Sequence, residues 1–167
     1  MSIPKRDVIK IGKANKGDIQ RIRKIDNFGE EILSNCSPLD KLDPKYKLKK
    51  GEKNYYEKFI MGKNKWCYIA ESEGKLLGYI LFNIEKREPY WKIKKVGYLD
   101  LIVIDKKERG KGISKLLFKK AYEIFKEKKL EYAKLSVQTD NDFAHKIWKK
   151  FGFKDFRVDM YRQLRKL

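Results

Sequence analysis

The sequence predicts an α/β domain built on a mixed, mostly antiparallel sheet with helices packed against it. Three observations carry this prediction: a hairpin signal at residues 73–75, a strand that ends at two glycines and leads into a helix, and a further strand and helix after it. A helical crossover joins parallel strands, so the strands that end at Ile104 and begin near Ala133 should pair in parallel. We expect a single domain spanning residues 1–167.

The N-terminal part of the chain predicts one strand and one helix. Residues 8–11 have the composition of a strand, and Asp18 is placed to cap a helix with isoleucine at every third position. The stretch from about 29 to 51 is less regular and rich in lysine, and a short helix is expected around 30–33.

The middle of the chain predicts a helix followed by three strands. Residues 52–61 have helical periodicity, with an apolar side made of Tyr55, Tyr56, Phe59 and Ile60. Residues 66–70 and 76–84 predict two antiparallel strands joined by a turn containing glycine. A charged loop that contains Trp91 then leads to a third strand over 96–104.

The last third of the chain predicts two helices and three short strands. The first helix follows the glycines and ends near Lys128, and the next strand covers 133–138. Asp140 or Asn141 should cap the second helix, which should bury Phe143, Ala144, Ile147 and Trp148. Residues 153–164 should add two short strands.

The charge balance is strongly basic. The chain carries 42 Lys and Arg against 23 Asp and Glu, a formal net charge of +19. Such a field attracts phosphates and nucleic acid. Because the excess is mostly lysine and is spread along the whole chain, we interpret it first as a compositional bias and only second as a nucleic-acid surface.

Several classes of site and location are not indicated. Cys36 and Cys67 have no spacing that suggests a disulfide framework or a zinc site, and we expect no metal. No apolar run approaches the ~20 residues needed to span a bilayer, and the N-terminus lacks the apolar core of a signal peptide. We therefore expect a cytoplasmic protein without membrane partners.

The turn Arg109-Gly110-Lys111-Gly112-Ile113-Ser114 has the features of an anion site. Glycines let backbone approach a ligand closely, and the first N–H groups of a helix have no internal partner. The turn is too short for the Walker pattern and lacks the third glycine of a dinucleotide fingerprint. A tight turn that needs glycine only for its geometry is the alternative.

The downstream segment makes this turn more specific. Residues 109–114 match the Gln/Arg-x-x-Gly-x-Gly/Ala pattern at Arg109 and Gly112, and Asn141, Ala144, Gly152 and Phe153 match the spacing of Asn-x-x-Ala-x-x-x-Tyr-x-x-x-Gly-Phe. In these two motifs the chain resembles the GNAT superfamily of acetyl-CoA-dependent N-acetyltransferases. The resemblance implies that fold, with a central sheet splayed between its fourth and fifth strands.

The resemblance implies a cofactor site made largely of backbone. N–H groups from Gly110 to Ser114 would hold the CoA pyrophosphate, and the Arg109 and Lys111 side chains would add positive charge. Ser114 replaces the usual Gly or Ala, and its hydroxyl could donate to a phosphate.

The pantetheine arm of CoA would lie along the preceding strand. The backbone of Ile102, Val103 and Ile104 would pair with it like an added strand, which requires a gap before the next strand. Asn141 would bind the same arm or hold the splayed strand ends, and Trp148 would lie beside it.

Trp148 takes the position of the tyrosine that in many members protonates the departing thiolate. An indole N–H donates a hydrogen bond but does not give up its proton usefully. Tyr98 and Tyr161 are candidate general acids in its place, and Tyr122 and Tyr132 are further phenols that the sequence does not rank. Trp148 is equally well explained as a core aromatic.

Asp100 is the candidate general base. It interrupts an otherwise apolar strand, and alternation places it on the face of Tyr98 and Ile102, opposite Leu99 and Leu101. A structural carboxylate paired with lysine or backbone is the alternative. His145, the only histidine, should lie at the surface of its helix.

The sequence thus predicts an enzyme that moves an acetyl group from acetyl-CoA to a primary amine of a small molecule or protein. A domain that binds acyl-CoA without catalysis is the first alternative, and a basic nucleic-acid-binding protein is the second. The sequence leaves open the acceptor, assembly as a homodimer and the role of residues 29–51.

Overall fold

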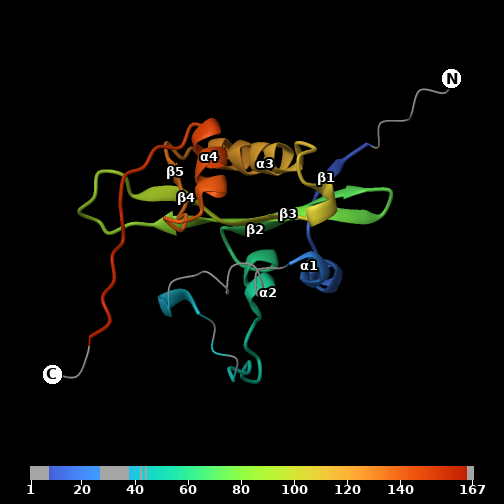
Figure 1. Ribbon diagram of the computed structural model, residues 1–167, viewed down its shortest axis with the longest axis horizontal. Coiled ribbons are helices and arrows are strands. Elements are labelled where there is room, and N and C mark those ends of the chain that lie inside the picture. The colour runs from blue at the N-terminus through green and yellow to red at the C-terminus, as the bar shows by residue number, and fades with distance from the viewer. Residues whose placement is uncertain (1–7, 27–37, 42, 44, 165–167) are drawn as a thin grey trace. The chain divides into compact units, whose positions relative to one another are not determined.

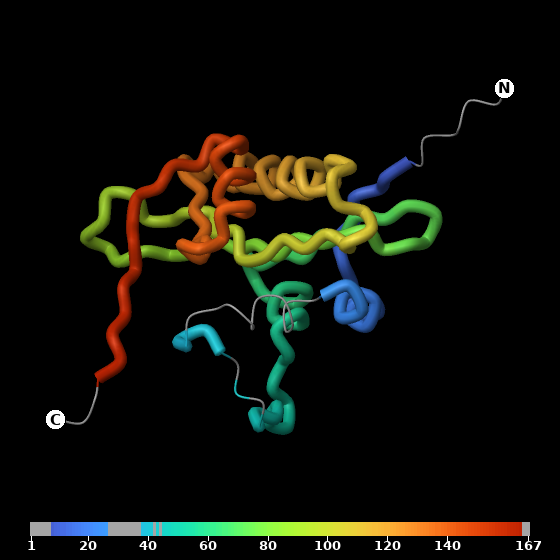
Figure 2. The backbone as a smooth tube through the Cα atoms, in the orientation of Figure 1, coloured from blue at the N-terminus to red at the C-terminus, as the bar shows by residue number. Residues whose placement is uncertain are grey.

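The structure is a computed structural model that describes residues 8–26, 38–41, 43 and 45–164. The chain forms two compact units, Met1–Ser136 and Val137–Leu167, and the path of each is traced in Figure 2. The short helix expected around residues 30–33, and Cys36, lie outside the described residues. Cys67 is described, and it is a free thiol in the core.

The first unit is organised around a five-stranded sheet in the order β1-β2-β3-β4-β5 (Figure 1). Neighbouring strands are antiparallel except β4 and β5, which run parallel. The mixed sheet predicted from the sequence is therefore confirmed. The strands are β1 (Lys10–Lys13), β2 (Lys65–Ser72), β3 (Lys75–Lys86), β4 (Lys95–Ile104) and β5 (Ala133–Lys134).

The predicted hairpin joins β2 to β3. Glu73 and Gly74 form its turn, and both have positive φ (49° and 77°), which matches a two-residue turn to the twist of the strands. The strand expected over 133–138 is shorter than predicted, because only Ala133 and Lys134 are paired.

Helices cover both faces of this sheet. Helices α1 (Ile19–Ile25) and α2 (Tyr55–Ile60) lie against one face, and α3 (Ile113–Glu127) lies against the other (Figure 1). The core below α1 and α2 is a cluster of eight buried residues: Ala14, Ile22, Phe59, Cys67, Ile69, Leu76, Tyr79 and Leu81. On the α3 face, the Phe82 and Phe125 rings meet edge to face at 5.4 Å.

Both helices of the first face begin at asparagine-capped turns. Asn54 caps α2 in a capping box with Glu57. Before α1, a 3₁₀ turn η1 (Lys16–Asp18) is capped in the same way by Asn15, whose N–H donates to the Asp18 carboxylate at 2.9 Å. Asp18 is the N-cap residue of α1, as predicted, but its side chain makes no capping hydrogen bond to that helix, because its carboxylate supplies the returning half of the Asn15 capping box.

Strand β4 contains an irregularity at Asp100. Leu101 pairs with Leu81 and Leu99 pairs with Phe82, so Asp100 is an extra residue on β4, a β-bulge. The bulge puts Leu101 against the core under α1 and α2. Ile102 pairs with Ile80 and faces the other side, so the predicted grouping of Asp100 with Ile102 and its predicted separation from Leu101 are both wrong.

The second unit contains helix α4 (Asp142–Lys150) and an extended C-terminal stretch. Gly152 (φ +87°) follows the helix in the left-handed conformation. The predicted burial of Phe143 is wrong, since that side chain is 71% exposed. The two strands expected over 153–164 are absent from the described residues, because no described strand pairs with that stretch.

Within the described residues, no helix combines the length and the apolar character needed to cross a bilayer.

Candidate functional site

One edge of β4 is left open by the short β5. The parallel pairing covers only Gly97 with Ala133 and Tyr98 with Lys134, whereas β4 continues to Ile104. In the described part of the chain, no strand pairs with Ile102, Val103 or Ile104 on that side. This is the gap that the sequence analysis required beside these three residues, and it offers backbone N–H and C=O groups to an extended ligand.

The glycine turn lies at the end of this open edge. After a 3₁₀ turn η4 (Lys106–Glu108), Gly110 and Gly112 adopt φ of +80° and +79°. If a Cβ atom were added at either glycine, no described atom would lie within 4 Å of it, apart from atoms of the adjacent residues. The turn is therefore both backbone-built and sterically open.

Helix α3 begins directly at this turn. Gly112 is its N-cap residue, and the first bonds of the helix run from the N–H groups of Lys115 and Leu116 to the Gly112 carbonyl. The N–H groups of Ile113 and Ser114 precede those bonds, so they point out of the helix with the positive end of its dipole behind them. Such a helix start can hold a phosphate.

The cations predicted at this turn have partners within the protein. Glu108 accepts from Lys111 and from Lys75, each at 2.6 Å, and these bonds lower the pKa of Glu108 to about 2. The Arg109 Nε donates to the Ile104 carbonyl at 3.3 Å. Arg109 and Lys111 thus lie beside the turn, as predicted, but their hydrogen bonds go to protein groups.

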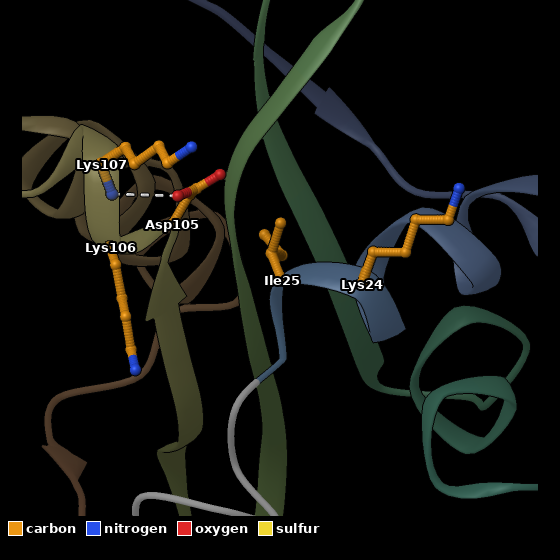
Figure 3. Close-up of a pocket in the computed structure, with 5 residues that line it drawn as sticks. All are labelled: Lys24, Ile25, Asp105, Lys106 and Lys107. Atoms are coloured by element: carbon orange, nitrogen blue, oxygen red, sulfur yellow. Dashed lines mark hydrogen bonds between the residues drawn. The ribbon is translucent and has the colours of Figure 1, made fainter.

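A shallow cavity of about 210 Å³ lies next to η4 and is lined by Lys24, Ile25, Asp105, Lys106 and Lys107 (Figure 3). The Lys107 N–H donates to the Asp105 carboxylate at 3.0 Å. Figure 3 shows the Lys24 and Lys106 side chains directed away from each other, so the cavity does not bring their ammonium groups together.

Asp100, the candidate base, lies on the α1/α2 face of the sheet. Its side chain is half-buried, and the Tyr55 hydroxyl of α2 donates to its carboxylate. Burial, followed by this bond to Asp100, raises the pKa of the Tyr55 phenol well above its ordinary value. Tyr55 therefore stays protonated and remains a donor to the carboxylate.

A second tyrosine–carboxylate pair lies beside the first. The Tyr56 hydroxyl donates to Asp26, the residue after α1, and the Tyr55 and Tyr56 rings meet at 5.6 Å. The buried Tyr79 ring lies edge-on to Tyr56 at 6.2 Å. We call these five residues, Asp26, Tyr55, Tyr56, Tyr79 and Asp100, the tyrosine–aspartate cluster.

Sequence reasoning found only part of this cluster. It proposed Asp100 as a base and placed the two α2 tyrosines on the apolar side of a helix, but it missed Asp26 and Tyr79. Two signals could have found them: Asp26 is a carboxylate directly after an apolar helix, and Tyr79 carries the only hydroxyl in the apolar run 76–82.

Tyr98, a candidate acid, lies where β4 and β5 are paired. Its hydroxyl donates to the Ser136 Oγ at 3.4 Å, and the Lys134 ammonium lies 5.5 Å from its ring centre. The phenol is also close enough to Tyr55 to contribute to the raised pKa of that residue.

The remaining predicted residues belong to the second unit. The Asn141 side chain accepts from the Ala144 N–H at 3.1 Å and so caps α4. Trp148 packs edge-on against Phe151 and Phe153, with ring centres 5.7 and 5.5 Å away. Tyr161 is 57% exposed.

His145, set aside as a surface residue, contacts Asp155 at 2.6 Å. Lys149 pairs with the same carboxylate at 2.8 Å. His145 therefore has a local partner within the second unit. Within the described residues, no group of His, Cys, Asp and Glu side chains is arranged to hold a metal ion.

Comparison with known proteins identifies the family to which this chain is similar. Residues 30–153 match the acetyltransferase (GNAT) family. The chain is also 30% identical over 119 residues to an uncharacterized N-acetyltransferase of Methanocaldococcus jannaschii, a match that covers 68% of this chain and 50% of that protein. The chain thus spans about half the length of this curated relative.

Solved structures share the fold at low sequence identity. A tetramutant of the BH1408 protein from Bacillus halodurans matches with a TM-score of 0.76 and 17% identity, over 93% of this chain and 99% of that one. The aminoglycoside N-acetyltransferase AAC(6')-Iy, in complex with CoA, matches with a TM-score of 0.68 and 17% identity, over 93% and 100%. These likenesses establish the fold of the chain.

Proposed function

The chain belongs to the acetyltransferase (GNAT) family, and on that premise we propose that it moves the acetyl group of acetyl-CoA to a primary amine of a small molecule or protein. The observation that carries the proposal is the continuity of one strand. The open edge of β4 runs from the Asp100 bulge to the glycine turn, so a long ligand on that edge would have its phosphates at α3 and its far end at a carboxylate.

The residues present fit CoA. Backbone groups of Ile102, Val103 and Ile104 would pair with its pantetheine arm, and N–H groups from Gly110 to Ser114 would hold its pyrophosphate. The open space at Gly110 and Gly112 supports this assignment, because a phosphate needs close backbone approach. Bound acetyl-CoA supplies the activated acetyl group.

Lys111 and Arg109 would contribute charge only after exchanging partners. Lys111 would leave Glu108, and Arg109 would leave the Ile104 carbonyl. Asn141 and Trp148 are assigned to the same cosubstrate through the family motif alone.

Asp100 would act as the general base. An amine acceptor is mostly protonated near neutral pH, so its proton must be removed before attack. Asp100 would take that proton, directly or through a water molecule. The nitrogen then forms a bond to the acetyl carbon as the C–S bond breaks, in a direct transfer within one ternary complex.

The departing thiolate needs a proton. Tyr98 and Tyr161 remain the proposed donors, since Trp148 cannot supply one. Trp148 packs against two phenylalanines, which supports a role as a packing residue of α4 and its C-terminal turn.

The test is in two stages. Calorimetry with acetyl-CoA measures binding, and thiol release from acetyl-CoA with a panel of amines measures transfer; the panel includes aminoglycosides because AAC(6')-Iy is named for them. We expect binding and acceptor-dependent release. Binding without release for any amine would favour the non-catalytic alternative, and absence of binding would refute both.

A further inference from the structure

We propose that the tyrosine–aspartate cluster binds an acceptor with two ammonium groups, one held at Asp26 and one presented at Asp100. This inference rests on the proposed acetyl transfer and names the class of acceptor: a diamine or longer polyamine. From the sequence, a small polyamine is one of several possible acceptors, and the net charge of +19 argues mildly against it.

The first argument is the partner of Asp100. Lysine and arginine are so abundant that many carboxylates of this fold are ion-paired: Asp18 and Glu71 with Arg21, Glu108 with Lys75 and Lys111, Glu85 with Lys134, and Glu123 with Lys120. Asp100 is different, because in the described part of the chain it makes no ion pair and is held by the Tyr55 phenol instead. A half-buried carboxylate held by a neutral donor has no protein cation to displace, so a cationic ligand can pair with it.

The second argument is the buried hydroxyl of Tyr79. The side chain is 0% exposed, and its oxygen has no partner of hydrogen-bonding geometry among the described residues. Burial, followed by the Asp26 charge and a hydrogen-bonding interaction with Asp26, raises the pKa of this phenol. The Tyr79 oxygen therefore interacts with Asp26 without meeting hydrogen-bond geometry, and a ligand N–H group held at Asp26 could complete its hydrogen bonding.

The third argument is the pairing of carboxylates with aromatic rings. The Tyr55 hydroxyl donates to Asp100 and the Tyr56 hydroxyl donates to Asp26, and the two tyrosines are neighbours on α2 with rings 5.6 Å apart. Carboxylates supply charge-assisted hydrogen bonds to ammonium groups, and aromatic faces attract cations between them. Two carboxylates bridged by two rings therefore suit two cations on one flexible chain better than they suit one.

Among the described residues of the cluster, Tyr55 is 40% exposed, whereas Tyr79 is buried with its ring edge-on to Tyr56. Rotation of the α2 rings would bring an acceptor to the Tyr79 oxygen. The tyrosine hydroxyls would then give up their places on the carboxylates to ligand N–H donors. The acceptor's ammonium group at Asp26 keeps its proton. The acceptor's other amine, at Asp100, loses its proton and is acetylated.

The test compares putrescine, a four-carbon diamine, with butylamine, which has the same length and one amine. We expect kcat/KM for putrescine to exceed that for butylamine by at least about tenfold, the discrimination expected of one charge-assisted hydrogen bond. Asp26→Asn should reduce this ratio by about the same factor. Glu127→Gln, which removes one negative charge on α3, should leave the ratio unchanged.

Tyr79→Phe gives a test with opposite signs. Removing the unpartnered hydroxyl should leave the melting temperature unchanged or raise it, while calorimetry should show weaker putrescine binding. A loss of both stability and binding would indicate a merely structural tyrosine and count against the proposal.

The outcomes separate this inference from the proposed function. Equal rates of acetyl transfer to putrescine and butylamine overturn the two-cation site and leave acetyl transfer standing. The same conclusion follows if Glu127→Gln loses the putrescine preference as strongly as Asp26→Asn does. If no amine turns over, putrescine binding by calorimetry decides: binding that is lost in Asp26→Asn supports the site, and no binding overturns it.

Discussion

The two ends of β4 differ in the groups that form their sites: backbone groups at one end and side chains at the other. At the glycine turn the proposed ligand groups are backbone N–H donors, and the neighbouring cations are engaged with Glu108 and the Ile104 carbonyl. At the Asp100 bulge the groups are side chains from three separate stretches, residues 26, 55–56 and 79, brought to one strand by packing. A backbone site serves one shared cosubstrate, whereas a side-chain site can change its acceptor by single substitutions.

The largest effect is expected from a substitution at the Asp100 bulge, where the site consists of side chains. Asp100→Asn should lower kcat by about 10²–10⁴-fold, the usual contribution of a positioned base. The affinity for acetyl-CoA, measured by calorimetry, should change little because the backbone end is intact. An Asp100→Asn enzyme that retains full kcat would show that the base lies elsewhere.

The next largest effect is expected from a substitution in the glycine turn, where the site consists of backbone groups. Gly112→Val should weaken acetyl-CoA binding by about a hundredfold, because its side chain would stand where phosphate must approach. Gly51→Val is the matched control, since Gly51 has a φ of +80° and equally open space but lies in the loop before α2. Both variants carry a left-handed strain of about 1–2 kcal/mol. Equal acetyl-CoA affinity in the two folded variants would refute the phosphate site.

A smaller effect sharpens the role of the phenols. Tyr55→Phe removes the donor to Asp100 and should lower kcat about threefold to tenfold, the value of one hydrogen bond to a charged group. Tyr46→Phe is the control, because Tyr46 also donates to a carboxylate, Glu52 at 2.7 Å, away from the cluster. Steady-state kinetics of both variants with one amine would compare them, and equal losses would contradict a specific role for Tyr55.

The smallest effect concerns stability against pH. The folded pKa of Glu108 is about 2, below its ordinary value of 4.5, so its contribution is present above about 4.5 and is lost as pH falls toward 2. Glu108→Gln should therefore reduce stability slightly near neutral pH and leave it unchanged at the acid end. Urea unfolding across this range measures the difference, and a constant offset at every pH would contradict the assignment.

Sequence reasoning succeeded where local pattern determines structure. The hairpin turn, the glycine turn and the asparagine that caps α4 are each decided by a few adjacent residues, and all three are found in the structure. It failed where the outcome depends on a partner: the Asp18 carboxylate bonds to Asn15 instead of capping α1, and no described strand pairs with residues 153–164. Asp26 and Tyr79 were missed for the same reason, because only packing brings them to α2.

The bulge at Asp100 acts as a phase shift in the pleat of β4. Odd-numbered residues face α3 before it, as Leu99 does with Phe82, and even-numbered residues face α3 after it, as Ile102 does with Ile80. Removing this one residue would move the side chains at one end of the strand to the opposite face of the sheet. Insertions and deletions along this strand would therefore exchange its two faces, and we expect acceptor preference to change through substitutions at residue 26, on α2 and on β3, which pack around Asp100.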